Sequence, residues 1–147
     1  MRLISLTALG LTTALLLSNS AYSAPQSSEA RPVELAQAAP LSNQFVTVDQ
    51  SKATTGSVRI VTENGQRYLE FDQQFSTARG PDVEVVLYRG ATIPGSIAES
   101  DYTAIAQLQS FQGSQRYAIP ESINLAEYGS VGIWCRRFNV TFGYAAV

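Results

Sequence analysis

The feature that most constrains the fold is an Asn-Gly pair between two stretches of alternating apolar residues. Asn64-Gly65 suits a two-residue type I′ turn, because both central positions of that turn need positive φ. A hairpin closed there gives three cross-strand pairs: Ile60 with Leu69, Val58 with Phe71, and Arg59 with Glu70. The apolar pairs then share one face and the ion pair takes the other, so the turn and the pattern predict the same register.

Further segments have the pattern of short strands separated by turn residues: 45–48, 82–88, 102–108, 115–119 and the region 128–143. Residues 124–128 have the pattern of a single helical turn. No long stretch repeats apolar residues at the helical period, and 45% hydrophobic residues indicate a globular chain. We therefore expect an all-β fold, an antiparallel β-sandwich or barrel-like single domain.

The first 42 residues have the pattern of a secretory signal peptide followed by a linker. Arg2, an apolar run over 3–17 and an Ala-x-Ser site ending at Ser23 are typical of a secretory signal peptide. The run is short for a membrane span, and no cysteine follows it for lipid attachment. Residues 24–42 contain no aromatic side chain and predict a flexible linker. The expected organisation is a signal peptide over 1–23, a linker over 24–42 and a β domain over 43–147. The mature protein would then be periplasmic or secreted, without a stable membrane span.

Composition removes several classes of function. The chain has no histidine, and its one methionine is Met1. Histidine-ligated zinc, His or Met ligands to haem, and Ser-His-Asp or Cys-His hydrolysis are therefore not expected in the mature chain. The net charge is −2 and the only basic pair is Arg136-Arg137, so there is no electrostatic footprint for nucleic acid.

The single cysteine, Cys135, lies in a hydrophobic stretch where the inward-facing positions change parity. Apolar residues occupy odd positions before the change and even positions after it: Val131, Ile133 and Cys135, then Phe138, Val140 and Phe142. Alternation in a strand therefore predicts either a β-bulge at Arg136-Arg137 or a tight turn into another strand. One cysteine allows no intramolecular disulfide.

Cys135 has two interpretations. An unpaired cysteine commonly behaves as a small buried hydrophobe. Alternatively, the adjoining Arg136 and Arg137 stabilise a thiolate and make it reactive, although either arginine could instead pair with Asp82 or Glu84. Trp134 faces the opposite side of a regular strand, where it would either pack or border an electron path or cofactor.

Two weaker patterns remain. Asp72, Asp82 and Glu84 could supply oxygens to calcium, but they show no regular ligand spacing, and Asp82 after Gly-Pro also suits a turn. Asn139-Val140-Thr141 matches a glycosylation acceptor, although it falls inside a predicted strand.

Three segments of the chain resemble the DM13 domain: 55–60, 75–87 with Gly80-Pro81-Asp82, and 128–143 with its Ile-Trp-Cys-Arg-Arg-Phe core. The resemblance covers about residues 44–147. It implies an extracytoplasmic β domain whose cysteine, here Cys135, is redox-active, either as a bare thiol or by holding a prosthetic group such as haem. Many members of that family carry a histidine before the Ser/Thr-Gly turn, where this chain has Gln50-Ser51-Lys52.

Two functions are compatible with these features. The first is an exported electron-transfer module that uses Cys135 and exchanges electrons with an exported partner protein. The second is a non-catalytic binding module with a structural Cys135, which presents a loop such as 89–101 to a protein or polysaccharide.

Overall fold

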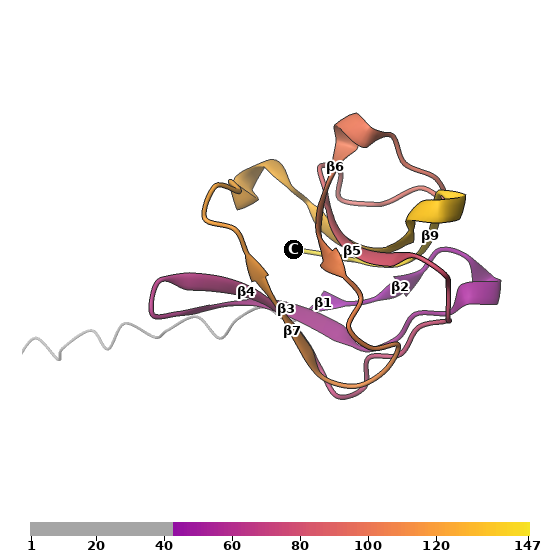
Figure 1. Cartoon of the computed structure of the whole chain (residues 1–147), viewed down its shortest axis with the longest axis horizontal. Coiled ribbons are helices and arrows are strands. Elements are labelled where there is room, and N and C mark those ends of the chain that lie inside the picture. Colours follow the sequence, from indigo (N-terminus) through magenta and orange to yellow (C-terminus); the bar gives the residue numbers. More distant parts are fainter. Residues whose placement is uncertain (1–42) are drawn as a thin grey trace, which may run out of the picture. The chain divides into compact units, whose positions relative to one another are not determined.

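The computed structural model describes residues 43–147; the predicted signal peptide and linker lie outside these residues (Figure 1). Within this range the chain forms two antiparallel sheets, so the all-β prediction is confirmed as an open sandwich rather than a closed barrel. The first sheet has the order β1-β3-β4-β7, with strands Asn43–Gln44, Ser57–Glu63, Gln66–Phe71 and Gln115–Ile119. The second has the order β2-β9-β8-β5-β6, with strands Val46–Thr47, Val140–Ala146, Ser130–Cys135, Val83–Tyr88 and Tyr102–Gln107.

The predicted hairpin is confirmed as β3 and β4. Asn64 and Gly65 have φ of 50° and 81°, as a type I′ turn requires. The pairs are those expected: Val58 with Phe71, Ile60 with Leu69, and Arg59 with Glu70. The strand predicted at 115–119 is β7, which pairs with β4 along its length. The helical turn predicted near 124–128 is the 3₁₀ turn η3, Leu125–Glu127.

Residues 45–48, predicted as one strand, instead cross from one sheet to the other. Asn43 and Gln44 pair with β3 in the first sheet, whereas Val46 and Thr47 pair with β9 in the second. Phe45 lies between the two segments and points into the core, where its ring is 5.3 Å from that of Phe71. The buried aromatic side chain thus fixes the point at which the chain changes sheet.

The core lies between the two sheets and contains apolar side chains from every long strand. In β5, Val83, Val85 and Leu87 face it, as alternation predicts. Glu84 and Val86, on the outer face, are buried too. Segment 89–99 covers Val86 with Ile93 and Ile97. The loop predicted to present a ligand is therefore anchored by these two isoleucines, with Pro94, Gly95 and Ser96 exposed between them.

Candidate functional site

The change of parity after Cys135 comes from a tight turn, and no bulge occurs at Arg136-Arg137. Strand β8 ends at Cys135, the 3₁₀ turn η4 (Arg136–Phe138) follows, and Asn139 adopts the left-handed conformation with φ of 48°. Strand β9 then returns so that Val140 pairs with Cys135. Phe138, expected to face inward, is 64% exposed because it lies in the turn. A bulge does occur later: Ile133 pairs with Gly143 and Trp134 with Thr141, which leaves Phe142 as the extra residue.

Cys135 is buried, with 1% of its surface exposed, and belongs to the core between the sheets. It also lines a surface hollow of about 170 Å³. The other residues around this hollow come from three separate parts of the chain: Asp49 and Lys52, then Arg79, Gly80 and Pro81, then Phe138, Val140 and Phe142. The thiol therefore lies at the boundary between the core and an opening to the surface.

Two cations contribute to the hollow. The side chains of Lys52 and Arg79 make no hydrogen bond or ion pair within residues 43–147, and each lies near an aromatic ring, of Phe142 at 5.9 Å and Phe111 at 5.2 Å. Asp49 adds one negative charge. Its carboxylate accepts hydrogen bonds from Oγ and the backbone N–H of Ser51, which hold its pKa below the usual value.

The segment Gln50–Lys52 forms the 3₁₀ turn η1, and Lys52 at its end lines this hollow. Lys52 is the basic residue that this segment provides. The sequence reasoning missed Lys52 and Arg79 as neighbours of Cys135, because only the sheet topology brings their segments to the end of β8.

The predicted neighbours Arg136 and Arg137 do not line the hollow. The guanidinium of Arg136 is 3.7 Å from the carboxylate of Glu84, and that of Arg137 is 5.9 Å from the ring of Phe138. Both side chains lie at the surface. The prediction that an arginine pairs with Glu84 is confirmed for Arg136.

Trp134 lies on the outer face of the second sheet, opposite Cys135, and is 4% exposed. Its ring packs on Tyr102 at 4.8 Å, and its Nε1 donates to Oδ1 of Asn139 at 3.0 Å. The same Asn139 side chain accepts from the backbone N–H of Ile97 and donates to its carbonyl, at 2.9 and 3.0 Å. The amide nitrogen that a glycan would need is therefore held in a structural hydrogen bond.

The three acids considered for calcium do not converge. Nε2 of Gln107 donates to both Asp82 and Glu84, whereas Asp72 lies at the first sheet and accepts from Ser57. Burial, and then the charge of Asp82, raise the pKa of Glu84 above its usual value. Within residues 43–147 no group of three or more His, Cys, Asp or Glu side chains is placed to hold a metal ion.

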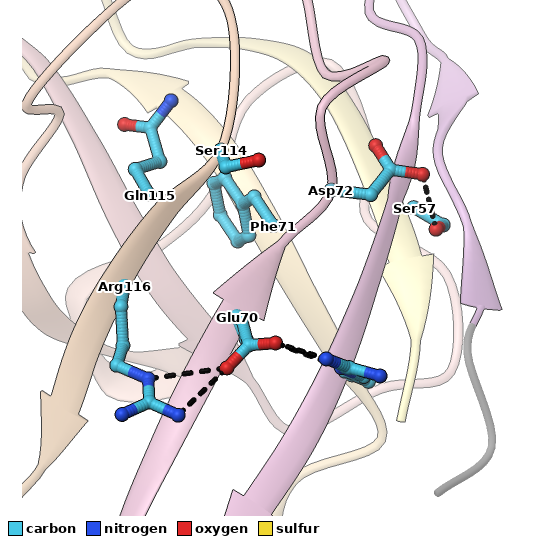
Figure 2. Close-up of a pocket in the computed structure, with 8 residues that line it drawn as sticks. Ser57, Glu70, Phe71, Asp72, Ser114, Gln115 and Arg116 are labelled. Atoms are coloured by element: carbon cyan, nitrogen blue, oxygen red, sulfur yellow. Dashed lines mark hydrogen bonds and ion pairs between the residues drawn. The ribbon is translucent and has the colours of Figure 1, made fainter.

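A second, larger hollow lies over the first sheet and was not foreseen (Figure 2). It has a volume of about 550 Å³ and is lined by Ser57, Arg59, Glu70, Phe71, Asp72, Ser114, Gln115 and Arg116. Figure 2 shows the Glu70 carboxylate between two guanidinium groups; it accepts from Arg59, and from Arg116 at 2.8 and 3.1 Å. These bonds lower the pKa of Glu70, so the charges in this hollow are largely paired.

Comparison with known protein families identifies the family of this domain. The profile described as electron transfer DM13 matches residues 44–147, which is nearly all of the described chain. The chain belongs to the DM13 family. The resemblance noted in the sequence is thereby confirmed, and a DM13 domain has a role related to electron transfer, which implies a redox partner. No curated protein and no solved structure matches the chain. Among residues 43–147 the DM13 domain has no helix long and apolar enough to cross a membrane.

The residues around Cys135 do not fit a haem. Pockets that enclose a small organic ligand have volumes of about 300–1,000 Å³, and the hollow at Cys135 is about 170 Å³. Residues 43–147 also contain no histidine or methionine that could act as a second axial ligand.

Proposed function

We propose that this DM13 domain is an exported electron-transfer module in which Cys135 is the redox group and acts as a bare thiol. The observation that carries the proposal is the hollow that joins the buried thiol to the surface between Lys52 and Arg79. The thiolate is the nucleophilic form of cysteine. Export is inferred from the signal-peptide pattern of residues 1–23.

The simplest reaction of a single thiol is exchange with a disulfide. The thiolate sulfur of Cys135 attacks one sulfur of the reactant disulfide, the S–S bond breaks, and a thiolate leaves with the bond's electron pair. Cys135 is then oxidised as a mixed disulfide. Because residues 43–147 hold no second cysteine, a second external thiol must attack the mixed disulfide and restore the Cys135 thiol. That thiol leaves as a disulfide with the remaining half of the first reactant, so one full cycle is a thiol–disulfide exchange between the two reactants.

Equilibration with a small neutral redox couple tests this proposal. The native domain is incubated with mercaptoethanol and hydroxyethyl disulfide at a series of ratios, and the mixed disulfide is quantified by intact mass. We expect the modified fraction to follow the ratio reversibly in folded protein, and Cys135→Ser to remain unmodified. A Cys135 that stays reduced at every ratio until urea unfolds the domain would contradict the proposal.

A second candidate function is a binding module, and the hollow over the first sheet favours it. That hollow adjoins another of about 460 Å³, which also contains Ser57 and Asp72. The two hollows present hydroxyl, amide and charged groups that could bind the hydroxyl groups of a polysaccharide. If this is the function, Arg116→Ala should abolish adsorption to the envelope polysaccharide of the host and Cys135→Ser should not. Equal adsorption by both variants would contradict it.

A further inference from the structure

We propose that the mouth of the Cys135 hollow selects small reactants that carry negative charge. The inference deepens the proposed function and rests on it, because it concerns the reactant that meets the Cys135 sulfur. Three observations support it: the distribution of unpaired cations, the position of the acidic groups, and the size of the opening.

The unpaired cations of the described chain gather near Cys135. Ten basic residues occur in the sequence, and all but Arg2 and Arg31 lie within 43–147, which leaves eight. Five of these eight bind protein oxygens through their side chains: Arg59, Arg67, Arg89, Arg116 and Arg136. The remaining three are Lys52 and Arg79, which line the hollow, and Arg137, in the turn that follows Cys135.

Few acidic groups oppose these charges. Asp49 lines the hollow and contributes one negative charge. Glu84 lies on the outer face of the second sheet, paired with Arg136, and Asp82 shares Gln107 with it. Among the residues that line the hollow, Lys52 and Arg79 against Asp49 leave one net positive charge. A concave site with one excess sign of charge concentrates ions of the opposite sign.

The size of the hollow sets the second property of the reactant. With 1% of its surface exposed, Cys135 cannot be contacted by the surface of a folded protein. The hollow of about 170 Å³ beside it has room for a short reactive group. Phe138 and Phe142 form an apolar wall, so the reactive end itself need not be polar. The class that fits is a small organic disulfide or similar sulfur electrophile with a sulfonate or carboxylate on its outer end.

Three methanethiosulfonates of different charge test this selectivity on the folded domain. They are the sulfonatoethyl (anionic), trimethylammonioethyl (cationic) and methyl (neutral) compounds. In each, the Cys135 thiolate attacks the sulfenyl sulfur, the S–S bond breaks, and methanesulfinate leaves with the electron pair, so that a mixed disulfide forms. Rates are measured at low salt and divided by the rate of each reagent with free mercaptoethanol.

We expect the normalised anionic rate to exceed the cationic rate about tenfold, since charged clefts change association rates by about 10–10³. The ratio should fall toward one at about 1 M salt, where the Debye length is about 3 Å. Lys52→Gln combined with Arg79→Gln should remove the preference. Arg59→Gln, which removes a paired charge on the other sheet, is the matched control and should retain it.

The rates test the charge selectivity separately from the reactivity of the Cys135 thiol. Equal normalised rates for the two charged reagents, a preference for the cation, or a preference that persists in the Lys52/Arg79 variant would overturn the selectivity. The salt series on the unmodified protein decides the question even if that variant fails to fold. If no reagent modifies the native protein, the reactive thiol of the proposed function fails, and the selectivity falls with it.

Discussion

The indole N–H of Trp134 donates to the side-chain oxygen of Asn139 at 3.0 Å, across the turn that joins β8 to β9. Asn139 also holds the backbone of Ile97, so one left-handed residue links the turn, the indole and the covering segment 89–99. The turn also carries Phe138, which forms part of the wall of the Cys135 hollow. The hydrogen bonds on the outer face of the sheet thus stabilise the entrance to the thiol on the inner side.

Replacing Asn139 by Ala should destabilise the domain by about 2–3 kcal/mol, because polar groups of Trp134 and Ile97 lose their partners in a largely buried position. The free energy of unfolding from urea titration and the emission of the only tryptophan measure the effect. Asn64→Ala is the control, since Asn64 has a similar φ in an exposed turn. Equal losses for the two variants would show that conformation alone, and not the bonds to Ile97 and Trp134, accounts for the role of Asn139.

A substitution at Gly143 in β9 tests the close packing of β9 against β2 in the second sheet. A Cβ at this position would lie 2.6 Å from Cβ of Thr54 and 2.8 Å from the carbonyl oxygen of Val46. Overpacking of this kind costs about 1–3 kcal/mol, and contact with backbone places Gly143→Ala at the upper end of that range. Gly95→Ala, whose Cβ would meet nothing within 4 Å, should be close to neutral in the same thermal unfolding experiment. Similar melting temperatures for both variants would contradict the packing described for β9.

Two carboxyl groups should show opposite pH dependence. The raised pKa of Glu84 means that its charge destabilises the folded state, and this cost disappears as the pH falls through the folded-state pKa. Glu84→Gln should therefore be more stable than the parent at neutral pH, with a gain that shrinks in acid.

Glu70 has a lowered pKa, so its contribution to the free energy of unfolding is present above the ordinary value of 4.5 and is lost as the pH falls through the folded-state pKa. Glu70→Gln should be less stable at neutral pH, with a deficit that shrinks in acid. Urea titrations across the acidic range measure both, and parallel curves would refute these assignments.

The absence of room for a haem gives a spectroscopic prediction. Protein purified from its own host should show the aromatic band of its tyrosines and Trp134 and no visible absorption. Cys135→Ser should give the same spectrum. A visible band that disappears in Cys135→Ser would reveal a prosthetic group on the thiol and would contradict the bare-thiol mechanism.

Local patterns predicted much of the fold. The Asn64-Gly65 turn and the alternation on either side of it determined the β3–β4 register, because hairpin pairing depends only on neighbouring residues. The switch of sheet at Phe45 was not predicted, since 45–48 has one uninterrupted strand pattern. The burial of Val86 was also missed, because it depends on Ile93 and Ile97 in a loop with no strand pattern.

The site was predicted only in part, because some of its residues are brought together by long-range contacts that a local sequence pattern does not show. The sequence pointed to Cys135 and to a tight turn as one explanation of the change in parity. It favoured Arg136 and Arg137 as the charges acting on the thiol, because they are its neighbours in the chain. The charges that line the hollow are those of Lys52 and Arg79, which reach it through long-range strand pairing.

Whether Cys135 is reactive in the folded domain is measured by its rate of reaction with methyl methanethiosulfonate as urea is raised from zero to just below the unfolding transition. If the hollow gives access to the thiol, the rate in the folded domain is measurable without urea and nearly independent of urea below the transition. If the thiol is only a core side chain, the reaction is negligible without urea and rises in proportion to the unfolded fraction. A redox-active thiol in the folded domain predicts the first result, and the second result would contradict it.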